Sequence, residues 1–335
     1  MVAIGFARKP RNDNWQLVRA RNIEVNTMDL GMIGLGRMGA NMAQRLLRGG
    51  HHIVGFDPNT DATSRARLQH IETVDSLTAL TRRLASPRVI WLMVPAGAPV
   101  DLTLSELRPL LDAGDIIIDG GNSNYKDSMR RAEELRRVGL HYLDVGTSGG
   151  IWGLEEGYSL MIGGERAIAD HLKPIFQTLA PAADRGWGYV GPSGAGHFVK
   201  MVHNGIEYGL MQAYAEGLAI LHAKEDFKLD LHQVTEIWRH GSVVRSWLLD
   251  LAARALSENP ALENIEASVA DSGEGRWTVA EAIDLNVSAP VITLALLRRL
   301  RSREDQPFAD KLLAVLRQQF GGHAVQLRDM RRKSA

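Results

Sequence analysis

Five polar residues able to transfer protons or bind anions fall at helical spacing in one apolar segment of the chain. They are Lys200, His203, Asn204, Glu207 and Tyr208. Their offsets place them on a single helix face, and apolar residues occupy the other faces. A lysine and a glutamate seven residues apart are too distant for the usual helix ion pair, which joins residues three or four apart. The pattern favours a helix that lines a cleft with these groups facing it.

Lys200 and Glu207 are the candidate general base and general acid of such a cleft. A lysine acts as a base only where burial and neighbouring charges lower its pKa, and a cleft closed over a bound cofactor would provide the burial. His203 and Asn204 would then donate or accept hydrogen bonds from a substrate. A solvated helix face is the alternative interpretation. Gly205 disfavours it, because a glycine costs about 1 kcal/mol in a helix interior and is better explained by the close approach of another segment.

A glycine fingerprint for dinucleotide binding lies nearer the start of the chain. Residues 29–33 form a short apolar run that ends in Gly34-Leu35-Gly36-Arg37-Met38-Gly39, and an amphipathic helical pattern follows. A second apolar run over residues 52–56 ends in Asp57. This order of strand, glycine turn, helix and strand is the context that the fingerprint requires. The three glycines permit a tight turn, the approach of a pyrophosphate to the backbone, and close helix–strand packing.

Asp57 bears on the choice of cofactor. A carboxylate at the end of the second strand accepts hydrogen bonds from the adenosine ribose hydroxyls and repels a 2′-phosphate. The next residues, Pro58 and Asn59, offer no adjacent cation to that phosphate. We therefore expect NAD to be preferred over NADP. A tight strand-to-helix turn that holds no ligand is the alternative interpretation of the glycines.

Strand and helix patterns continue to alternate up to about residue 194. Further strands are predicted at 89–94, 115–119 and 142–145, and a helix at 125–138. Polar clusters at 119–123 and 146–150 follow two of these strands. Because parallel sheets bind ligands at the carboxyl ends of their strands, both clusters fall where a site would lie.

The strand patterns stop after about residue 195. Helical patterns cover most of 195–256 and 278–302, with a shorter one near 307–320. The sequence thus predicts an α/β fold, in which a Rossmann-type doubly wound sheet at residues 28–194 precedes an all-helical domain at residues 195–335. Residues 1–27 mix basic and acidic residues with few apolar ones. We interpret them as a loosely held extension or the result of a misassigned start codon.

Composition excludes several classes of protein and site. The chain has 335 residues, and its 39 Lys and Arg balance its 39 Asp and Glu, which disfavours a general nucleic-acid binder. Cysteine is absent, which excludes disulfides, zinc–thiolate sites and iron–sulfur clusters. No apolar stretch approaches the roughly 20 residues needed to cross a bilayer, and no secretory signal is evident. We expect a soluble, cytoplasmic protein that binds neither nucleic acid nor membranes.

Together these motifs resemble the 6-phosphogluconate dehydrogenases, within the wider β-hydroxyacid dehydrogenase superfamily. The superfamily motifs are residues 34–39, Ser148-Gly149-Gly150, and residues 191–200 with Asn204. The motifs more specific to 6-phosphogluconate are Asp119-Gly-Gly-Asn-Ser123, His203-Asn204 with Glu207-Tyr208, and Arg317-Gln-Gln-Phe-Gly-Gly-His323. The resemblance covers residues 29–323 and indicates the short form, which lacks the second large helical segment of the long enzymes.

The resemblance implies a role for each matching residue. Lys200 would take the proton of the C3 hydroxyl of 6-phosphogluconate as hydride leaves for NAD, and Glu207 would protonate C1 after CO2 is lost, giving ribulose 5-phosphate. The sugar acid would be held by Asn122, Ser148, Gly149, Gly150, His203 and Asn204. Its phosphate would be held by Tyr208, Arg298, Arg317 and His323. The cofactor would contact Gly34, Leu35, Gly36, Arg37, Met38, Gly39, Asp57, Val94, Pro95, Ala96 and Asn122.

Two further expectations follow from the same resemblance. The reaction needs no metal. In this family the tail segment comes from a neighbouring subunit, so Arg317 and His323 imply a homo-oligomer, a dimer or a tetramer. For Arg298, a plain surface arginine is the alternative interpretation, with Arg299 as another candidate for the same role.

The chain departs from the family at one loop. Long members carry a lysine in a Gly-Thr-Gly-Lys-Trp-like loop that helps to bind the phosphate, and here Ser272 stands in its place while Glu274 is added. Arg276 aligns with a second lysine and need not face the site. Two other functions therefore stay open: a dehydrogenase for a small non-phosphorylated 3-hydroxy acid, which would need Lys200 and Asn204 but not Glu207 or the tail, and a dinucleotide-binding protein without catalysis.

Overall fold

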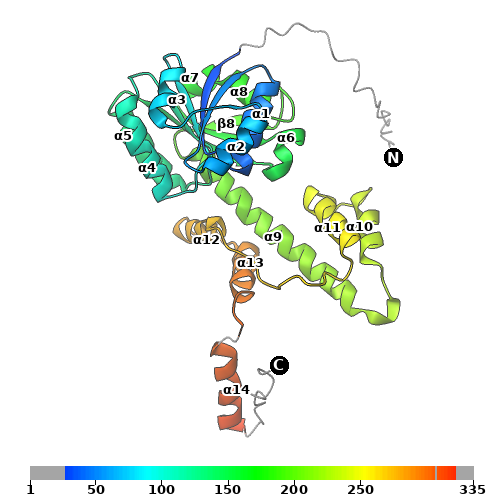
Figure 1. The fold of residues 1–335 in the computed structure, drawn as a ribbon. Helices are drawn as coiled ribbons and strands as arrows, with labels where there is room; N and C mark the ends of the chain where they lie inside the picture. The colour runs from blue at the N-terminus through cyan, green and yellow to red at the C-terminus, as the bar shows by residue number, and fades with distance from the viewer. Residues whose placement is uncertain (1–26, 306–307, 322–335) are drawn as a thin grey trace, which may run out of the picture.

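The structure is a computed structural model that describes residues 27–305 and 308–321 (Figure 1). The extension expected at residues 1–27 lies almost wholly outside the described residues, and so does His323. Within the described ranges, one sheet and the helices packed on it form the first half of the molecule. A long helix then leads to a second, helical part.

The sheet has the order β3-β2-β1-β4-β5-β6-β7-β8 among the described residues. Neighbours from β3 to β6 pair in parallel, β7 is antiparallel to β6, and β8 is parallel to β7. The strands are β1 (Asp29–Ile33), β2 (His52–Phe56), β3 (Glu72–Thr73), β4 (Val89–Leu92), β5 (Ile116–Asp119), β6 (His141–Ser148), β7 (Ser159–Gly164) and β8 (Trp187–Gly191). The first six strands follow the order of a doubly wound dinucleotide-binding sheet, as the sequence predicts.

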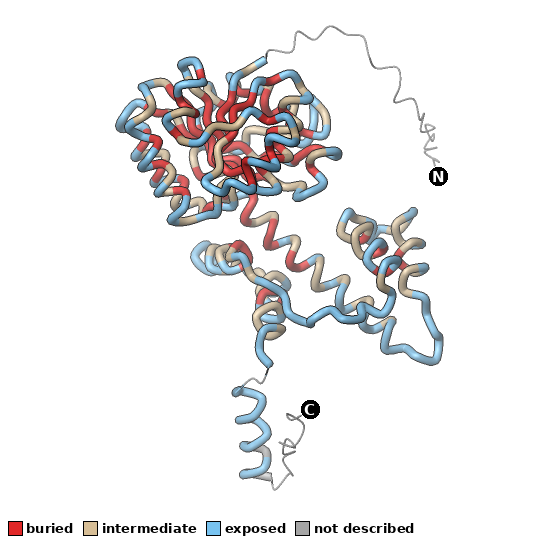
Figure 2. Tube along the Cα trace, in the orientation of Figure 1, coloured by how far each residue is buried: buried red, intermediate tan, exposed pale blue. Residues whose placement is uncertain are grey.

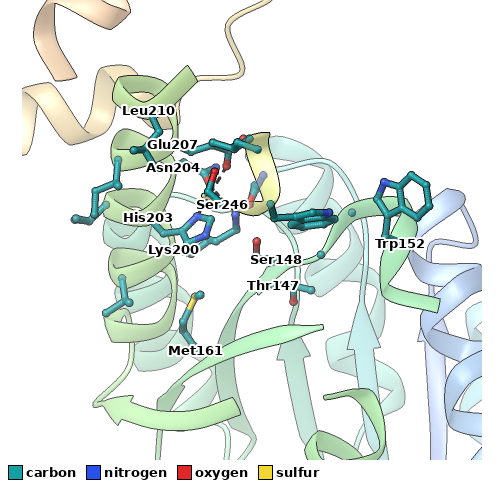
Figure 3. A pocket seen from close by; sticks show the side chains of 18 of the residues that line it. Thr147, Ser148, Trp152, Met161, Lys200, His203, Asn204, Glu207, Leu210 and Ser246 are labelled. Carbon is teal, nitrogen blue, oxygen red and sulfur yellow. Dashed lines mark hydrogen bonds and ion pairs between the residues drawn. The ribbon is translucent and has the colours of Figure 1, made fainter. Parts of the chain in front are cut away.

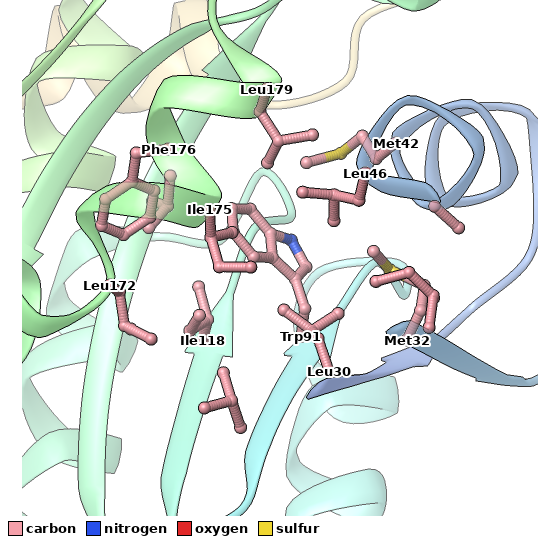
Figure 4. Packing of buried hydrophobic residues seen from close by; sticks show 14 of the residues in the cluster. Leu30, Met32, Met42, Leu46, Trp91, Ile118, Leu172, Ile175, Phe176 and Leu179 are labelled. Atoms are coloured by element: carbon pink, nitrogen blue, oxygen red, sulfur yellow. The ribbon is translucent and has the colours of Figure 1, made fainter. Parts of the chain in front are cut away.

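Helices cover both faces of this sheet. They are α1 (Arg37–Arg48), α2 (Thr60–Leu68), α3 (Leu77–Arg83), α4 (Ala98–Leu107), α5 (Tyr125–Arg136), α6 (Gly153–Glu156), α7 (Arg166–His171) and α8 (Lys173–Leu179). Successive strand side chains point to opposite faces, so Leu30 and Met32 pack with α1 and α8, whereas Ile33 packs with α3 and α4. Trp91 is fully buried in the layer between the sheet and helices α1 and α8, where it packs against Phe176 (Figure 4). Buried apolar side chains fill the space between the sheet and the helices on each face. This packing holds the carboxyl edge of the sheet in place.

The second part of the described chain is helical. Its elements are α9 (Ala195–Ala223), α10 (Leu231–Arg239), α11 (Trp247–Glu258), α12 (Glu274–Asp284), α13 (Pro290–Arg301) and α14 (Phe308–Gly321). Helix α9 emerges from the sheet, and α10, α11, α12 and α13 contact it at different points along its length (Figure 1). Helices α13 and α14 extend away from the sheet; the described side chains of α14 are exposed, whereas α13 is partly buried around Ala295 and Leu296 (Figure 2). None of the described helices is long and apolar enough to cross a membrane.

The strand boundaries differ from the predicted ones where polar residues end the apolar runs. The run 89–94 is a strand only to Leu92, because the chain turns towards the sheet edge there. The strand predicted at 142–145 runs from His141 to Ser148 because it pairs with β7 through Gly146, Thr147 and Ser148. That extension places Ser148 at the last position of the strand. The helical pattern over 195–256 is three helices, since residues 240–246 form a turn between α10 and α11.

Candidate active site

Helix α9 begins against the sheet with almost no space between the two backbones. A Cβ on Gly196 would overlap the carbonyl oxygen of Asp144 and lie 2.5 Å from that of Met161. A Cβ on Gly146 would overlap the Cβ of Lys200 and lie 2.6 Å from the oxygen of Gly196. Only glycine fits at either position, and the result is that Lys200 projects from a point fixed by two strands.

The buried carboxylate of Asp144 caps the same helix. Asp144 Oδ1 accepts a hydrogen bond from the backbone N–H of Gly194 at 2.7 Å, and Oδ2 accepts one from that of His197 at 2.9 Å. Both donors belong to the unpaired N–H groups of a helix N-terminus, where a negative charge is stabilised. His197 is buried as well, and its Nδ1 lies 2.7 Å from Ser128 Oγ on α5. The start of α9 is thus held by side chains from two neighbouring elements.

Lys200 lies on the next turn and is 7% exposed. Its Nζ donates a hydrogen bond to Asn204 Oδ1 at 2.5 Å, and His203 Nδ1 lies 3.1 Å from the same oxygen. His203 Nδ1 also lies 4.0 Å from Glu207 Oε2. Four of the five residues of the polar stripe therefore form one connected group along α9.

Burial lowers the pKa of Lys200 below the ordinary 10.5, and the carboxylates of Glu207 and Glu274 oppose this shift. Desolvation disfavours the charged ammonium, whereas nearby anions favour it. A lysine with a lowered pKa has a larger neutral fraction near neutral pH and can accept a proton there. A lowered pKa is what we expected from the sequence for a lysine that acts as a base in a cleft.

A cavity of about 1030 Å³ opens in front of this group (Figure 3). It lies between α9, the end of β6 with the following loop, and the start of α11. Residues that the sequence singled out form much of its wall: Met38, Asn122, Ser148, Gly149, Gly150, Lys200, His203, Asn204 and Glu207. The structure thus gathers a candidate base, a candidate acid and several hydrogen-bonding groups around one space large enough for a small ligand.

The loop after β6 is shaped by its glycines and held by the cofactor helix α1. Gly149 and Gly150 have positive φ values of 132° and 53°, which favour glycine. Asn41 on α1 donates to the carbonyl of Ile151 at 3.3 Å, and Arg45 donates to that of Leu154 at 3.0 Å. This wall of the cavity is therefore tied to the helix that follows the glycine fingerprint.

The glycine fingerprint leaves room for a pyrophosphate at one position. A Cβ on Gly39 would overlap the oxygen of Gly34, and one on Gly34 would overlap that of Met93, so both glycines are required by packing. A Cβ on Gly36, in contrast, would meet nothing within 4 Å. Gly36 is exposed at the N-cap of α1, where backbone N–H groups and the helix dipole attract an anion. The loop therefore fits the diphosphate of NAD or NADP.

Asp57 ties this loop to the end of β2. Its Oδ2 accepts the N–H of Leu35 at 2.7 Å and its Oδ1 accepts that of Asn59 at 2.8 Å. The carboxylate is therefore oriented by the backbone on both sides. Val94, Pro95 and Ala96 follow β4 at the neighbouring position on the same sheet edge, with Pro95 and Ala96 exposed. Asp57, Val94, Pro95 and Ala96 do not line the cavity. Met38 and Asn122, which the resemblance also assigns to the cofactor, do line it and thus connect the expected cofactor site with the cavity.

The loop that carries Asn122 is held by a buried arginine on α5. Arg131 Nη1 donates to Ser123 Oγ at 3.2 Å, and its Nη2 donates to the carbonyl of Gly97 at 3.1 Å. Asp119 accepts the hydroxyls of Ser123 and Tyr142 at 2.7 and 3.0 Å. One side chain thus links the loop after β4 to the loop after β5.

Tyr208, Arg298 and Arg299 do not line the cavity. Tyr208 is buried against Ala295 and Leu296 of α13, and a Cβ on Gly275 would overlap its ring. The guanidinium of Arg299 lies 3.6 Å from the centre of that ring, whereas Arg298 is exposed. Of the two arginines considered from the sequence, the structure places Arg299 beside Tyr208. Arg317 falls in α14, and its side chain lies outside the described part of the chain.

The sequence reasoning missed the wall that faces α9. Trp152 follows the glycine loop and Trp247 begins α11, and both line the cavity. Arg254 of α11 packs 4.9 Å from the ring centre of Trp152 and joins α11 to the sheet side of the cavity. No local pattern in the sequence marked either tryptophan as part of the site. No group of three or more potential metal ligands occurs among the described residues.

The chain matches two families along most of its length. Residues 29–190 match the NAD binding domain of 6-phosphogluconate dehydrogenase, and residues 196–315 match the 6-phosphogluconate dehydrogenase C-terminal domain. The chain is similar to the NAD(+)-dependent, decarboxylating 6-phosphogluconate dehydrogenase of Haloferax volcanii, with 46% identity over 90% of this chain and 100% of that protein. It is 42% identical to the putative 6-phosphogluconate dehydrogenase YqeC of Bacillus subtilis, over 89% of this chain and 99% of that one.

Longer relatives align only in part. The NAD(+)-dependent enzyme of Bacillus subtilis is 38% identical over 85% of this chain, which spans 64% of that enzyme. Among solved structures, the 6-phosphogluconate dehydrogenase of Plasmodium falciparum superposes with a TM-score of 0.76 and 30% identity, over 90% of this chain and 67% of that one. This chain therefore has the length of the short relatives.

Proposed function

The chain belongs to the 6-phosphogluconate dehydrogenase family, and we propose that it converts 6-phosphogluconate into ribulose 5-phosphate and CO2 with reduction of NAD. The observation that carries the proposal is the position of Lys200 and Glu207. Both line one cavity from a single helix, and Lys200 is buried with a pKa below its ordinary value. A base and an acid on the same wall are what an oxidation followed by a decarboxylation requires.

Lys200 removes the proton of the C3 hydroxyl in the first step. Its hydrogen bond to Asn204 at 2.5 Å fixes the direction of the amine, and burial makes the neutral form accessible. The nicotinamide, when bound, accepts the hydride that leaves C3. The resulting 3-keto acid loses CO2 because its β-carbonyl accepts the electron pair of the broken bond.

Glu207 then returns a proton to C1 of the enediol. It lies two helical turns beyond Lys200 on the same face and contacts the same cavity. His203 lies between them and within 4.0 Å of Glu207, so it can bind a hydroxyl of the substrate without displacing either group. Asn122, Ser148, Gly149 and Gly150 on the opposite wall would hold the carboxylate end.

Asp57 supports a preference for NAD over NADP. Its carboxylate is held at the end of β2 by the N–H groups of Leu35 and Asn59, so it cannot turn away from a 2′-phosphate without losing those bonds. Substitution Asp57→Asn keeps an acceptor oxygen and removes the charge. The ratio of kcat/KM for NADP to that for NAD should then rise by about tenfold or more, which corresponds to about 1.4 kcal/mol. An unchanged ratio would contradict this preference.

The phosphate end of the substrate is proposed to be bound with help from a second copy of the chain. Arg299 and Tyr208 pack together outside the cavity, and Arg298, Arg317 and His323 complete the proposed set. Helices α13 and α14 present apolar side chains to solvent: Val291, Leu294, Leu297, Phe308, Leu312, Leu313, Val315 and Leu316. Exposed apolar surface on this scale indicates a protein interface, which supports a homo-oligomer. Light scattering of the purified protein tests this directly, and a monomer would contradict it.

The activity is tested by following NADH and CO2 formation from 6-phosphogluconate. The proposal predicts equimolar NADH and CO2 with NAD, and slower turnover with NADP. 3-Hydroxyisobutyrate, a small non-phosphorylated acid, serves as the parallel substrate. Activity with the small acid alone would contradict the proposed substrate and would point to Ser272, which stands where long relatives have a phosphate-binding lysine.

A further inference from the structure

Glu274 is a carboxylate buried beside the catalytic helix. It is the first residue of α12 and is 3% exposed. Its Oε2 accepts a hydrogen bond from Ser272 Oγ at 2.5 Å. The nearest loop arginine, Arg276, pairs with Asp271 instead, and no ion pair within the described residues includes Glu274. Burial of a carboxylate is costly unless hydrogen bonds or a cation compensate it, and the Ser272 hydroxyl supplies one such hydrogen bond.

The first turn of α12 is packed directly on the turn of α9 that bears Lys200. Thr278 Oγ1 lies 2.9 Å from the carbonyl oxygen of Met201 and 2.8 Å from that of Glu274. The Thr278 hydroxyl thus lies within hydrogen-bond distance of two backbone carbonyls, that of Met201, the residue after Lys200, and that of Glu274. A Cβ on Gly205 would lie 2.6 Å from the methyl group of Thr278, so the two helices touch at this point.

The two departures from the family loop form one unit. Ser272 stands where a lysine would, and its hydroxyl donates to Glu274. A lysine at 272 would instead bring a cation against this carboxylate and neutralise it. The serine leaves this carboxylate without a cation among the described residues, on a helix that packs against α9 at Met201 and Gly205.

We propose that Glu274, held by Ser272, is a positioning residue that acts through Lys200: a second buried anion, besides Glu207, that sets the proton affinity of the catalytic amine. This inference rests on the proposed function, which makes Lys200 the proton acceptor. The carboxylate counteracts the desolvation of Lys200, so that the amine remains basic enough to remove a hydroxyl proton while still reaching its neutral form.

Other titratable groups around Lys200 are already engaged. On its own helix these are His203 and Glu207, which lie 4.0 Å apart. On β6, Asp144 accepts two N–H groups of the α9 N-terminus. Glu274 is the acidic group contributed by α12, and its removal therefore changes the field at Lys200 without disturbing the others.

The test measures the protonation of Lys200 in the ligand-free, full-length protein. Reductive methylation at a series of pH values, with mass spectrometry of the peptide that contains Lys200, gives the midpoint of its titration. Glu274→Gln should lower this midpoint by about one pH unit, the usual effect of losing an opposite charge nearby. Glu274→Asp keeps the charge but shortens the side chain, so its midpoint should fall between those of the wild type and Glu274→Gln. This second variant provides the test if Glu274→Gln does not fold.

Glu281→Gln is the matched control. Glu281 lies on the same helix but accepts the hydroxyl of Tyr125 at 2.7 Å, so its removal should leave the Lys200 midpoint unchanged. Equal midpoints in the wild type and Glu274→Gln, or equal shifts in Glu274→Gln and Glu281→Gln, would overturn the inference. In turnover, the acid limb of the kcat/KM profile should move to lower pH by the same amount. A labelling shift in a protein that does not oxidise 6-phosphogluconate would overturn the proposed function and leave the link between Glu274 and Lys200 standing.

Discussion

Gly146 on β6 lies directly against the Cβ of Lys200 on α9, and this approach is possible only because Gly146 has no side chain. A Cβ at position 146 would overlap the Cβ of Lys200 and approach the oxygen of Gly196 at 2.6 Å. The sheet therefore determines where the side chain of Lys200, the proposed base, leaves the helix. A single methyl group added at this point would move it.

Gly146→Ala should lower kcat by about 100-fold, because a displacement of about 1 Å is enough to misalign a reacting group. The free energy of unfolding should fall by about 1–3 kcal/mol through overpacking. Gly188→Ala is the control, since a Cβ on Gly188 would meet nothing within 4 Å. Steady-state kinetics and thermal unfolding of both variants check this prediction, and wild-type kcat in Gly146→Ala would refute it.

The fingerprint glycines should separate binding from folding. Gly36→Ala places a methyl group in open space at the N-terminus of α1, so the melting temperature should be nearly unchanged while the Kd for NAD rises at least tenfold. Gly39→Ala overlaps the oxygen of Gly34 and should destabilise the fold. Calorimetric titration with NAD decides the matter: wild-type affinity in Gly36→Ala would show that the pyrophosphate lies elsewhere.

Arg131 should matter far more than its neighbour Arg130. Arg131 is buried and holds Ser123, Asp101 and the carbonyl of Gly97. Arg131→Met should therefore destabilise the protein by about 3–5 kcal/mol, because it leaves the buried carboxylate of Asp119, 3.6 Å from Arg131 Nη1, without its cation. It should also raise the KM for NAD and for 6-phosphogluconate, because the loops that Arg131 holds would shift. Arg130→Met removes a half-exposed arginine that pairs with Asp101, and should cost only about 0–1 kcal/mol. Chemical denaturation of the two variants provides the comparison, and equal losses would contradict the account.

Lys200 should reduce stability at neutral pH. Its folded-state pKa lies below 10.5 because of burial, so the unfolded chain binds the proton more tightly, and protonation favours unfolding. The penalty is fully present below the folded pKa and is relieved as the pH rises towards the unfolded value. Lys200→Met should therefore melt at a higher temperature than the wild type at pH 7, with the difference shrinking towards pH 10. A lower melting temperature for Lys200→Met across this range would contradict this prediction.

The sequence was most informative where local chemistry decides the structure. The glycine turn at 34–39, the acid at position 57 and five of the first six strands follow from short motifs and alternating apolar runs. The two-residue strand β3 was not predicted, because Glu72–Thr73 is too short to form an apolar run. The stripe on α9 was predicted from helical spacing, and Lys200, His203, Asn204 and Glu207 do share one cavity. Tyr208 has the same spacing but is turned towards α13. One face of a helix can contact two different structures, here the cavity and α13. Helical periodicity does not show which of the two a given side chain contacts.

Long-range packing accounts for what the sequence did not reveal. The reversed strand β7 and strand β8 are short and contain glycines, so their pairing depends on β6 being extended to Ser148. Trp152 and Trp247 come together only because α11 folds back towards the sheet. The burial of Glu274 depends on the contact of Thr278 on α12 with Gly205 and Met201 on α9. None of these contacts leaves a local pattern.

The most direct test of the central claim compares Lys200→Met and Glu207→Gln with the wild type in NADH formation from 6-phosphogluconate. Each variant is also titrated with NAD alone, because neither residue is assigned to the cofactor. The account predicts that Lys200→Met forms no measurable NADH and that Glu207→Gln turns over at least 100-fold more slowly, while both bind NAD with near wild-type affinity. Substantial NADH formation by Lys200→Met, or loss of NAD affinity in Glu207→Gln, would show that α9 positions the site without carrying its chemistry.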